Sequence, residues 1–163
     1  MMAEDKFPRF SNMDFIPDDA YPIEDSGAYI NIKAMGIRSV EFVRIINDRL
    51  LFIEARSSVA HPDNSPEPYR VQINEIYEKF VHSLNLMASI KIGIIKESLP
   101  ASFNSERKLS LEFVLVVRDH KPEWCRRVRL ALYQLLPEYL VKIWRPEVMV
   151  VNYEKAKEYD LVS

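Results

Sequence analysis

The chain has 163 residues, which is enough for one domain with a substantial hydrophobic core. Hydrophobic residues make up 48% and charged residues 28%, as in ordinary globular proteins, and a net charge of −2 gives no overall attraction to polyanions. The single cysteine, Cys125, excludes an intramolecular disulfide and a multi-cysteine zinc site, and it indicates a reducing compartment. Only three glycines occur and none forms a GxGxxG or GxxxxGK loop, which excludes P-loop NTPases and ordinary dinucleotide-binding proteins.

The sequence contains no membrane or export signal. No apolar run approaches the roughly 18–20 residues of a membrane span, so we expect no membrane partner. The N-terminal sequence MMAEDKFPRF lacks the apolar core of a secretory signal. We therefore expect a cytoplasmic protein.

Residues 1–25 are rich in proline, aspartate and asparagine and carry scattered aromatic residues. This composition predicts an N-terminal arm, extended or partly disordered, ahead of a single α/β domain in residues 26–163. Asp25 and Ser26 are favourable N-cap residues, so residues 27–35 fit a short helix. The alternating pattern inside that segment fits a strand equally well.

The most informative segment is residues 40–58, VEFVRIINDRLLFIEARSS, which predicts two strands joined by a two-residue turn at Asn47 and Asp48. In this register, residues whose numbers sum to about 95 face each other. Glu41 then lies opposite Glu54, on the same face of the sheet. A turn one residue longer would move Glu41 to the other face.

The later elements alternate between strands and helices. The apolar run at residues 50–53 predicts a strand buried on both faces, near the middle of the sheet, and the three prolines of residues 57–69 predict a loop. The remaining predicted elements are a helix over 71–92 that stops near Gly93, a strand over 109–118, a helix from Pro122 to about 136, a strand over 147–152 and a helix over 153–159 capped by Asn152. Since strand–helix–strand order implies parallel crossovers, we expect a mixed central β-sheet with helices on both faces.

Two opposed glutamates repel each other unless a cation lies between them. One candidate is a metal ion, which would make Glu41 and Glu54 metal ligands. The other is Arg56, which lies two residues after Glu54 and therefore on the same face. Arg56 would turn the three side chains into a structural ion-pair network.

An acidic residue on one strand, a hairpin, and Glu-x-Lys on the next strand, followed by a helix and a further strand, are typical of the PD-(D/E)XK nuclease superfamily. The chain resembles this pattern over residues 26–118, with Glu41 at the first acidic position and Glu54-Ala55-Arg56 at the E-x-K position. The resemblance implies a restriction-endonuclease-like fold. It also implies that Glu41 and Glu54 hold Mg²⁺, which polarises the phosphodiester and generates hydroxide from bound water.

The resemblance implies roles for residues outside the motif as well. Gln72 opens the helix after the motif, where nucleases of this type often place a polar residue near the substrate. Glu24 and Asp25 precede the first candidate helix, where a third metal carboxylate sometimes lies.

Arg56 departs from the motif, because arginine cannot lose its proton to act as a base and its planar guanidinium places charge differently from lysine. The replacement and the acidic pI favour a degenerate, non-catalytic binding or assembly module, in which Glu41, Glu54 and Arg56 are structural. The paired carboxylates favour the alternative, a Mg²⁺-dependent nuclease with Arg56 as an electrostatic stabiliser.

One stretch concentrates basic residues, and a nucleic-acid partner would bind there. It comprises Arg118, Lys121, Arg126, Arg127 and Arg129. A solvated helix face is the commoner explanation of such a stretch, and phosphate contact is the alternative. The sequence leaves a homo-oligomer open and names no other partner.

Overall fold

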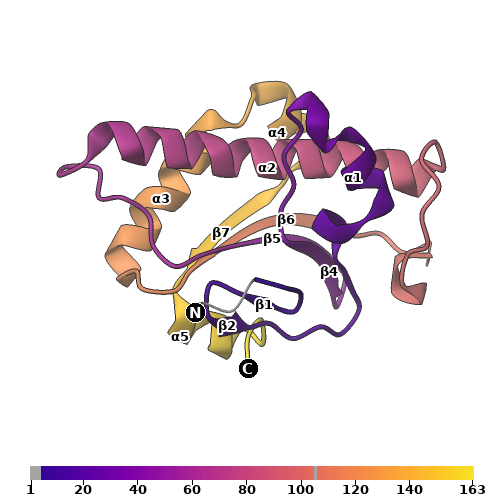
Figure 1. Ribbon diagram of the computed structural model, residues 1–163, viewed down its shortest axis with the longest axis horizontal. Helices are drawn as coiled ribbons and strands as arrows, with labels where there is room; N and C mark the ends of the chain where they lie inside the picture. The colour runs from indigo at the N-terminus through magenta and orange to yellow at the C-terminus, as the bar shows by residue number, and fades with distance from the viewer. Residues whose placement is uncertain (1–4, 105) are drawn as a thin grey trace.

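The computed structural model describes residues 5–104 and 106–163 (Figure 1). Residues 1–4 of the predicted arm lie outside the described residues. The described chain forms a five-stranded sheet in the order β3-β4-β5-β6-β7 and a separate hairpin, β1-β2. The strands are β1 (Arg9–Phe10), β2 (Met13–Asp14), β3 (Ala20–Tyr21), β4 (Phe42–Ile46), β5 (Arg49–Arg56), β6 (Ser110–Val117) and β7 (Glu147–Val151).

The sheet is mixed, as predicted. Strand β4 runs antiparallel to β3 and β5, whereas β5, β6 and β7 run parallel to one another. Strand β5 occupies the middle of the sheet, which agrees with its apolar run.

Helices connect the parallel strands. The helices are α1 (Gly27–Ile32), α2 (Pro66–Ile92), α3 (Pro122–Leu135), α4 (Glu138–Trp144) and α5 (Tyr153–Glu158), with short 3-10 turns η1 (Ile23–Asp25), η2 (Lys33–Met35) and η3 (Ala101–Asn104). Helix α2 forms the crossover from β5 to β6, and α3 with α4 forms the crossover from β6 to β7. The sequence patterns did not predict α4 as a separate helix.

Local signals account for most helix ends. Residues 27–35 are helical rather than extended, because the Ser26 hydroxyl accepts the Tyr29 N–H and caps α1. Helix α2 ends at Gly93, which adopts a left-handed φ of 94°. It begins at Pro66 rather than at residue 71, since proline is tolerated at the first position of a helix. The predicted loop is therefore shorter than expected.

The β4–β5 hairpin has the predicted register. Val43 pairs with Phe52 and Ile46 with Arg49 across a two-residue turn. The paired ladder ends one step before the two glutamates, and the Glu41 N–H donates to the Ile53 carbonyl at 3.1 Å. The register alone had predicted that Glu41 pairs with Glu54. In the structure the two residues do not form a regular pair.

Alternation along the strands gives the sheet two different buried faces. One face carries Phe52 and Phe113 and packs against helices α1 to α4, with Phe113 stacked on Phe80 of α2 at 4.9 Å between ring centroids. The other face carries Ile53 and Val114 and packs against the N-terminal arm, α5 and the C-terminal residues. The predicted coverage by helices on both faces is confirmed, with most of the helices on one side (Figure 1).

The described part of the N-terminal arm packs against the second face of the sheet. Phe10 lies 6.2 Å from Phe42 of β4 in a stacked arrangement, and Phe15 bridges to Val162 near the C-terminus. In Figure 1 the β1-β2 hairpin and both chain ends lie on the side of the sheet opposite α2. In residues 5–104 and 106–163, no helix has the length and apolar character required to traverse a membrane.

Candidate functional site

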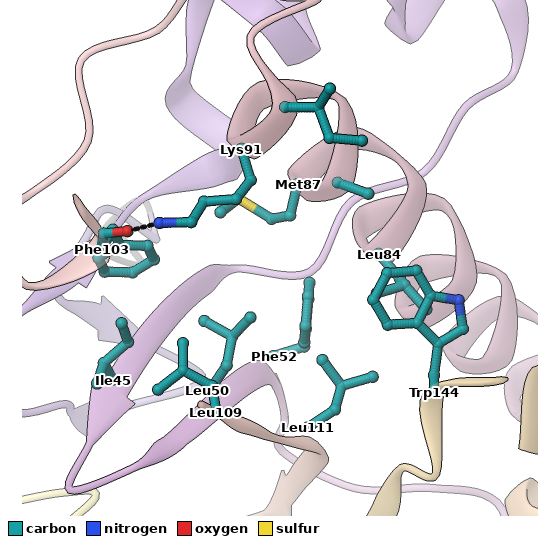
Figure 2. A pocket seen from close by; sticks show the side chains of 12 residues that line it. Ile45, Leu50, Phe52, Leu84, Met87, Lys91, Phe103, Leu109, Leu111 and Trp144 are labelled. Carbon is teal, nitrogen blue, oxygen red and sulfur yellow. Dashed lines mark hydrogen bonds between the residues drawn. The ribbon is translucent and has the colours of Figure 1, made fainter. Parts of the chain in front are cut away.

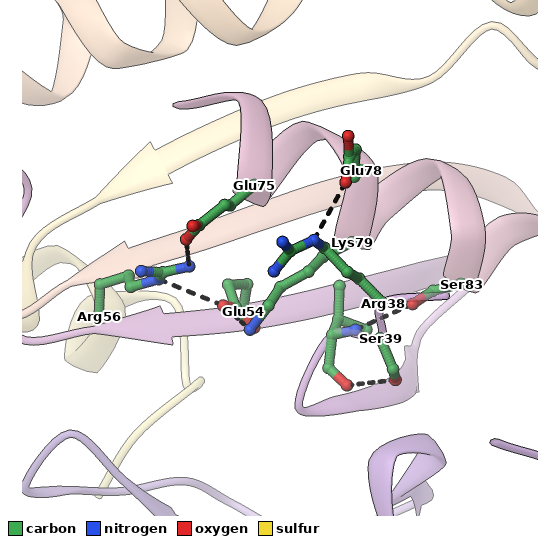
Figure 3. Close-up of polar contacts among 9 residues, drawn as sticks. Arg38, Ser39, Glu54, Arg56, Glu75, Glu78, Lys79 and Ser83 are labelled. Carbon is green, nitrogen blue, oxygen red and sulfur yellow. Dashed lines mark hydrogen bonds and ion pairs between the residues drawn. The ribbon is translucent and has the colours of Figure 1, made fainter. Parts of the chain in front are cut away.

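The centre of the site is Glu54, which alternation along β5 places on the face covered by α2. Its side chain is 0% exposed. Its Oε2 atom accepts a hydrogen bond from Lys79 Nζ at 2.8 Å and lies 3.4 Å from Arg56 Nε (Figure 3). A buried carboxylate requires such partners, because an unpaired charge in the interior costs several kcal/mol, on the order of 3–5.

Lys79 is the functional residue that the sequence patterns missed, because its position in α2 was assigned to the solvent side of the helix. In the structure its side chain is only 19% exposed and points from α2 to Glu54 (Figure 3). Burial by itself would lower the pKa of Lys79, but the adjacent Glu54 and Glu41 carboxyls outweigh burial and raise it. Lys79 therefore keeps its positive charge.

A polar stripe along α2 would have identified this side chain. Gln72, Glu75, Lys79 and Ser83 are spaced three or four residues apart and share one helix face. Each has a partner outside the helix: the Gln72 Oε1 accepts the Ala60 N–H at 2.7 Å, Glu75 lies 3.6 Å from Arg56, Lys79 binds Glu54, and Ser83 Oγ accepts the Val40 N–H at 2.9 Å. Four tertiary polar contacts at helical spacing indicate that this face covers the end of the hairpin.

Gln72 lies outside the charged cluster. Its side chain accepts the Ala60 N–H, which ties the start of α2 to the loop after β5. The structure brings together the other three predicted site residues, Glu41, Glu54 and Arg56, and adds Lys79.

Glu41 is the second carboxyl of the site. Burial, followed by the nearby Glu54 and Glu24 carboxyls, raises the pKa of Glu41 to about 10. Burial also raises the pKa of Glu54, against the opposing effect of Lys79. Because the lysine is bonded to Glu54, we assign the negative charge to Glu54 and a proton to Glu41 near neutral pH.

Glu24 is a third carboxyl near the first two. It lies in η1, close enough to Glu41 for its carboxyl to contribute to the raised pKa of Glu41. Carboxyls from η1, from the residue before β4 and from β5 therefore lie near one another.

One carboxylate oxygen of the cluster lacks a hydrogen-bond donor within the described part of the chain. Glu54 Oε1 is buried and has no hydrogen-bond partner among the described residues. An unsatisfied buried acceptor costs about 1–3 kcal/mol, so this oxygen favours any cation that reaches it. Carboxylate oxygens are the ligands that Mg²⁺ prefers, and Mg²⁺ usually takes only one or two of them together with water and phosphate oxygens.

Glu41 and Glu54 are the carboxyls that could hold such an ion, with Glu24 beside them. No group of three or more His, Cys, Asp or Glu side chains in residues 5–104 and 106–163 is already arranged to enclose a metal ion. A closed set is not what Mg²⁺ demands, since it keeps several of its waters.

An open groove leads to the site. It has a volume of about 570 Å³, and Glu41, Glu24 and Asp25 line it. The opposite wall comes from the N-terminal arm, and Lys6 and Lys33 contribute the two cations of its lining.

Arg56 does not close this groove. Its guanidinium is shared between Glu54 at 3.4 Å and Glu75 at 3.6 Å, both long contacts, and its side chain is 25% exposed. Arg56 lies beside Glu54 on β5, whereas Glu41 faces the groove. The arginine therefore compensates part of the charge of Glu54 without occupying the space next to Glu41.

A second, apolar pocket of about 190 Å³ lies between α2 and the starts of β5 and β6 (Figure 2). Phe52, Leu84 and Trp144 line it, and the Lys91 ammonium turns aside to the Phe103 carbonyl (Figure 2). Lys91 is the one ionisable residue among its described lining side chains, so the pocket differs in character from the charged cluster.

The basic stretch is largely engaged in structural contacts. Arg127 forms two bonds to Asp63 at 3.0 and 3.2 Å, Arg129 donates to the Val148 carbonyl, Lys121 lies over Trp124, and Arg118 is 4.0 Å from Asp119. Arg126 is exposed, and within the described residues no ion pair engages it. Helix α3 packs on β7, at the opposite edge of the sheet from β4 and α1 (Figure 1).

Comparison of the chain with protein-family models, curated proteins and solved structures found no match in any of the three.

Proposed function

We propose that this protein is a metal-dependent phosphodiesterase of the PD-(D/E)XK type, with Glu41 and Glu54 as the Mg²⁺ ligands. The observation that carries the proposal is the bond from Lys79 to Glu54 at 2.8 Å. The motif position of the lysine holds Arg56, but α2 supplies a lysine to the same carboxylate. The order of α1, β4, β5, α2 and β6 supports a restriction-endonuclease-like assignment of the fold.

The chemistry follows from the charges of the cluster. Mg²⁺ bound at Glu41 and Glu54 would polarise the phosphodiester and activate a water molecule. Lys79 holds a fixed positive charge beside the carboxylates, where it stabilises negative charge on the phosphoryl oxygens. Glu75 holds the Arg56 guanidinium partly away from Glu54.

A substitution of Glu41 tests the proposal without disturbing the fold. Glu41→Gln keeps the size and shape of the side chain but removes one of the two carboxyls that would hold the metal. We expect purified wild type to hydrolyse bis-p-nitrophenyl phosphate or a labelled oligonucleotide with Mg²⁺ or Mn²⁺. Glu41→Gln should lower the rate by about 10²–10³-fold, the loss typical of removing one electrostatic element.

Glu78→Gln is the matched control. Glu78 lies next to Lys79 in α2 but binds Arg38 at 3.0 Å, outside the cluster (Figure 3). It should keep the wild-type rate. Absence of hydrolysis by wild type with both metals, and absence of Mn²⁺ or Mg²⁺ binding by calorimetry, would refute the proposed function.

A non-catalytic binding or assembly module is the second candidate. The observation that favours it is the complete burial of Glu54 between Lys79 and Arg56, since these two cations compensate its charge without a metal. Calorimetry separates the two candidates, because a structural network predicts no heat of Mn²⁺ binding in wild type or in Glu54→Ala.

A further inference from the structure

Building on the function proposed above, we propose that the substrate is a single-stranded nucleic-acid segment or strand end. It would be held through about two phosphates by Lys6 and Lys33, and long duplexes would be excluded.

The size of the groove supports a small section of strand. Its volume of about 570 Å³ lies within the roughly 300–1,000 Å³ range of sites that enclose a single small molecule. Glu41 lies in its lining, so the reacting phosphate has to enter the groove. A duplex would have to lay its backbone across the rim instead.

The charges of the groove limit how many phosphates it accepts. Lys6 comes from the arm and Lys33 from η2, and both ammonium groups are exposed. Within residues 5–104 and 106–163, neither has an ion-pair partner among the salt bridges of the fold. Asp5, Glu24 and Asp25 are exposed in the same lining and repel further phosphates.

Lys6 is held in place by the arm. The Lys6 N–H donates to the Arg9 carbonyl at 3.1 Å, and the Arg9 N–H donates to the Lys6 carbonyl at 2.7 Å. Phe10, which follows in the chain, is only 4% exposed and anchors this turn in the core. The part of the arm that lines the groove together with Glu41 is thus packed into the fold, which limits the approach of a wide ligand.

Among the described residues, the basic stretch of the sequence does not line the groove. The concentrated arginines lie on α3, which packs on β7, whereas the groove lies beside α1 and β4. Arg127 and Arg129 are already bound to Asp63 and to the Val148 carbonyl. A long polyanion would therefore gain little beyond the two lysines.

The salt dependence of binding tests the inference directly. The dissociation constant of a fluorescein-labelled single-stranded oligonucleotide is measured by anisotropy in CaCl₂, over a range of KCl concentrations. Two phosphate contacts predict a slope of log K against log salt of about −1.4 for a single strand. Lys6→Gln and Lys33→Gln should each make the slope shallower by about 0.7, and Arg126→Gln on α3 should leave it unchanged.

Binding and hydrolysis separate the two proposals. Weak duplex binding, shallow salt dependence and the effects of both lysine variants support the inference. Preference for the duplex, a slope near −4 or steeper, an effect of Arg126→Gln, or no binding of the single strand overturns it. Single-strand binding with the expected slope but without hydrolysis in MgCl₂ or MnCl₂ refutes the catalytic function and leaves the binding site in place.

Discussion

Glu54 is the central charged residue of the site. It is buried, it forms ion pairs with Lys79 and Arg56, and it lies near Glu41. Such a group is tolerated only while its partners remain, because the interior does not solvate an isolated charge. The shorter contact is the one to Lys79, at 2.8 Å against 3.4 Å for Arg56. At the residue scale, the lysine of α2 is therefore the main counter-charge.

Removing that counter-charge should cost stability. We expect Lys79→Met to lower the free energy of unfolding by about 3–5 kcal/mol, because it leaves the Glu54 carboxylate buried with only the long contact to Arg56. The double variant Glu54→Gln/Lys79→Met should regain most of this loss, since the charge leaves together with its partner. Urea unfolding measures both values.

Lys142→Met serves as the control, because the ion pair of Lys142 with Glu138 lies on the surface with both side chains more than 70% exposed. Its unfolding midpoint should equal that of wild type. A double variant as unstable as Lys79→Met would contradict the role assigned to the pair.

At the scale of the element, α2 both packs the core and orders the site. Its apolar residues, such as Ile76 and Phe80, are buried on the sheet, while its polar stripe bonds to segments around the hairpin. Ser83 fastens the segment just before Glu41 through the Val40 N–H, and Gln72 fastens the loop after Arg56 through Ala60. One helix thus holds both strands that carry the glutamates.

The bond of Ser83 to Val40 predicts a measurable loss. Ser83→Ala should lower the free energy of unfolding by about 1–3 kcal/mol, because it leaves the buried Val40 N–H without its acceptor. Asn85→Ala is the matched variant, since Asn85 is exposed and bonds only to the Val81 carbonyl of its own helix. Equal losses in the two variants would show that the effect comes from the helix and not from the tertiary bond.

On the scale of the whole molecule, the two buried faces of the sheet place distant segments together. The arm and the C-terminal residues close one face, and the groove opens where the arm meets α1 and β4. At the other end, His120 lies where β6, α3 and α5 meet. Its ring packs 5.3 Å from Trp124, and its carbonyl accepts a bond from Asn152.

This junction predicts a pH dependence of stability. Burial, and secondarily the nearby His61, lowers the pKa of His120 below its ordinary 6.5. The unfolded chain therefore binds the proton more readily than the folded one, so the stabilisation is complete above about pH 6.5 and declines as the pH falls through the lowered value. Urea unfolding at about pH 7.5 and 5.5 should show a smaller difference for His120→Gln than for wild type. The same difference in both proteins would assign the decline to other groups.

Prediction from the sequence succeeded where the information is local. The Asn47-Asp48 turn sets the hairpin register, and Ser26, Gly93 and Asn152 mark helix ends through their own backbone and side-chain geometry. The start of α2 was misplaced, because proline fits the first turn of a helix as well as a loop. Helix α4 was missed because it is short and exposes apolar side chains, including Ile143 at 69% and Tyr139 at 64%.

The candidate site shows the same division. Local alternation along β5 was enough to bring Glu54 and Arg56 to one face, because side chains in a strand alternate with a period of two, whereas Glu41 lies just before β4. The association of Lys79 with Glu54, and of Glu24 with Glu41, required the packed fold, since the direction in which α2 and η1 cross the hairpin depends on the whole core. The motif in the sequence pointed to a carboxylate pair with an arginine, and packing of a distant helix added the lysine on which the proposed function rests.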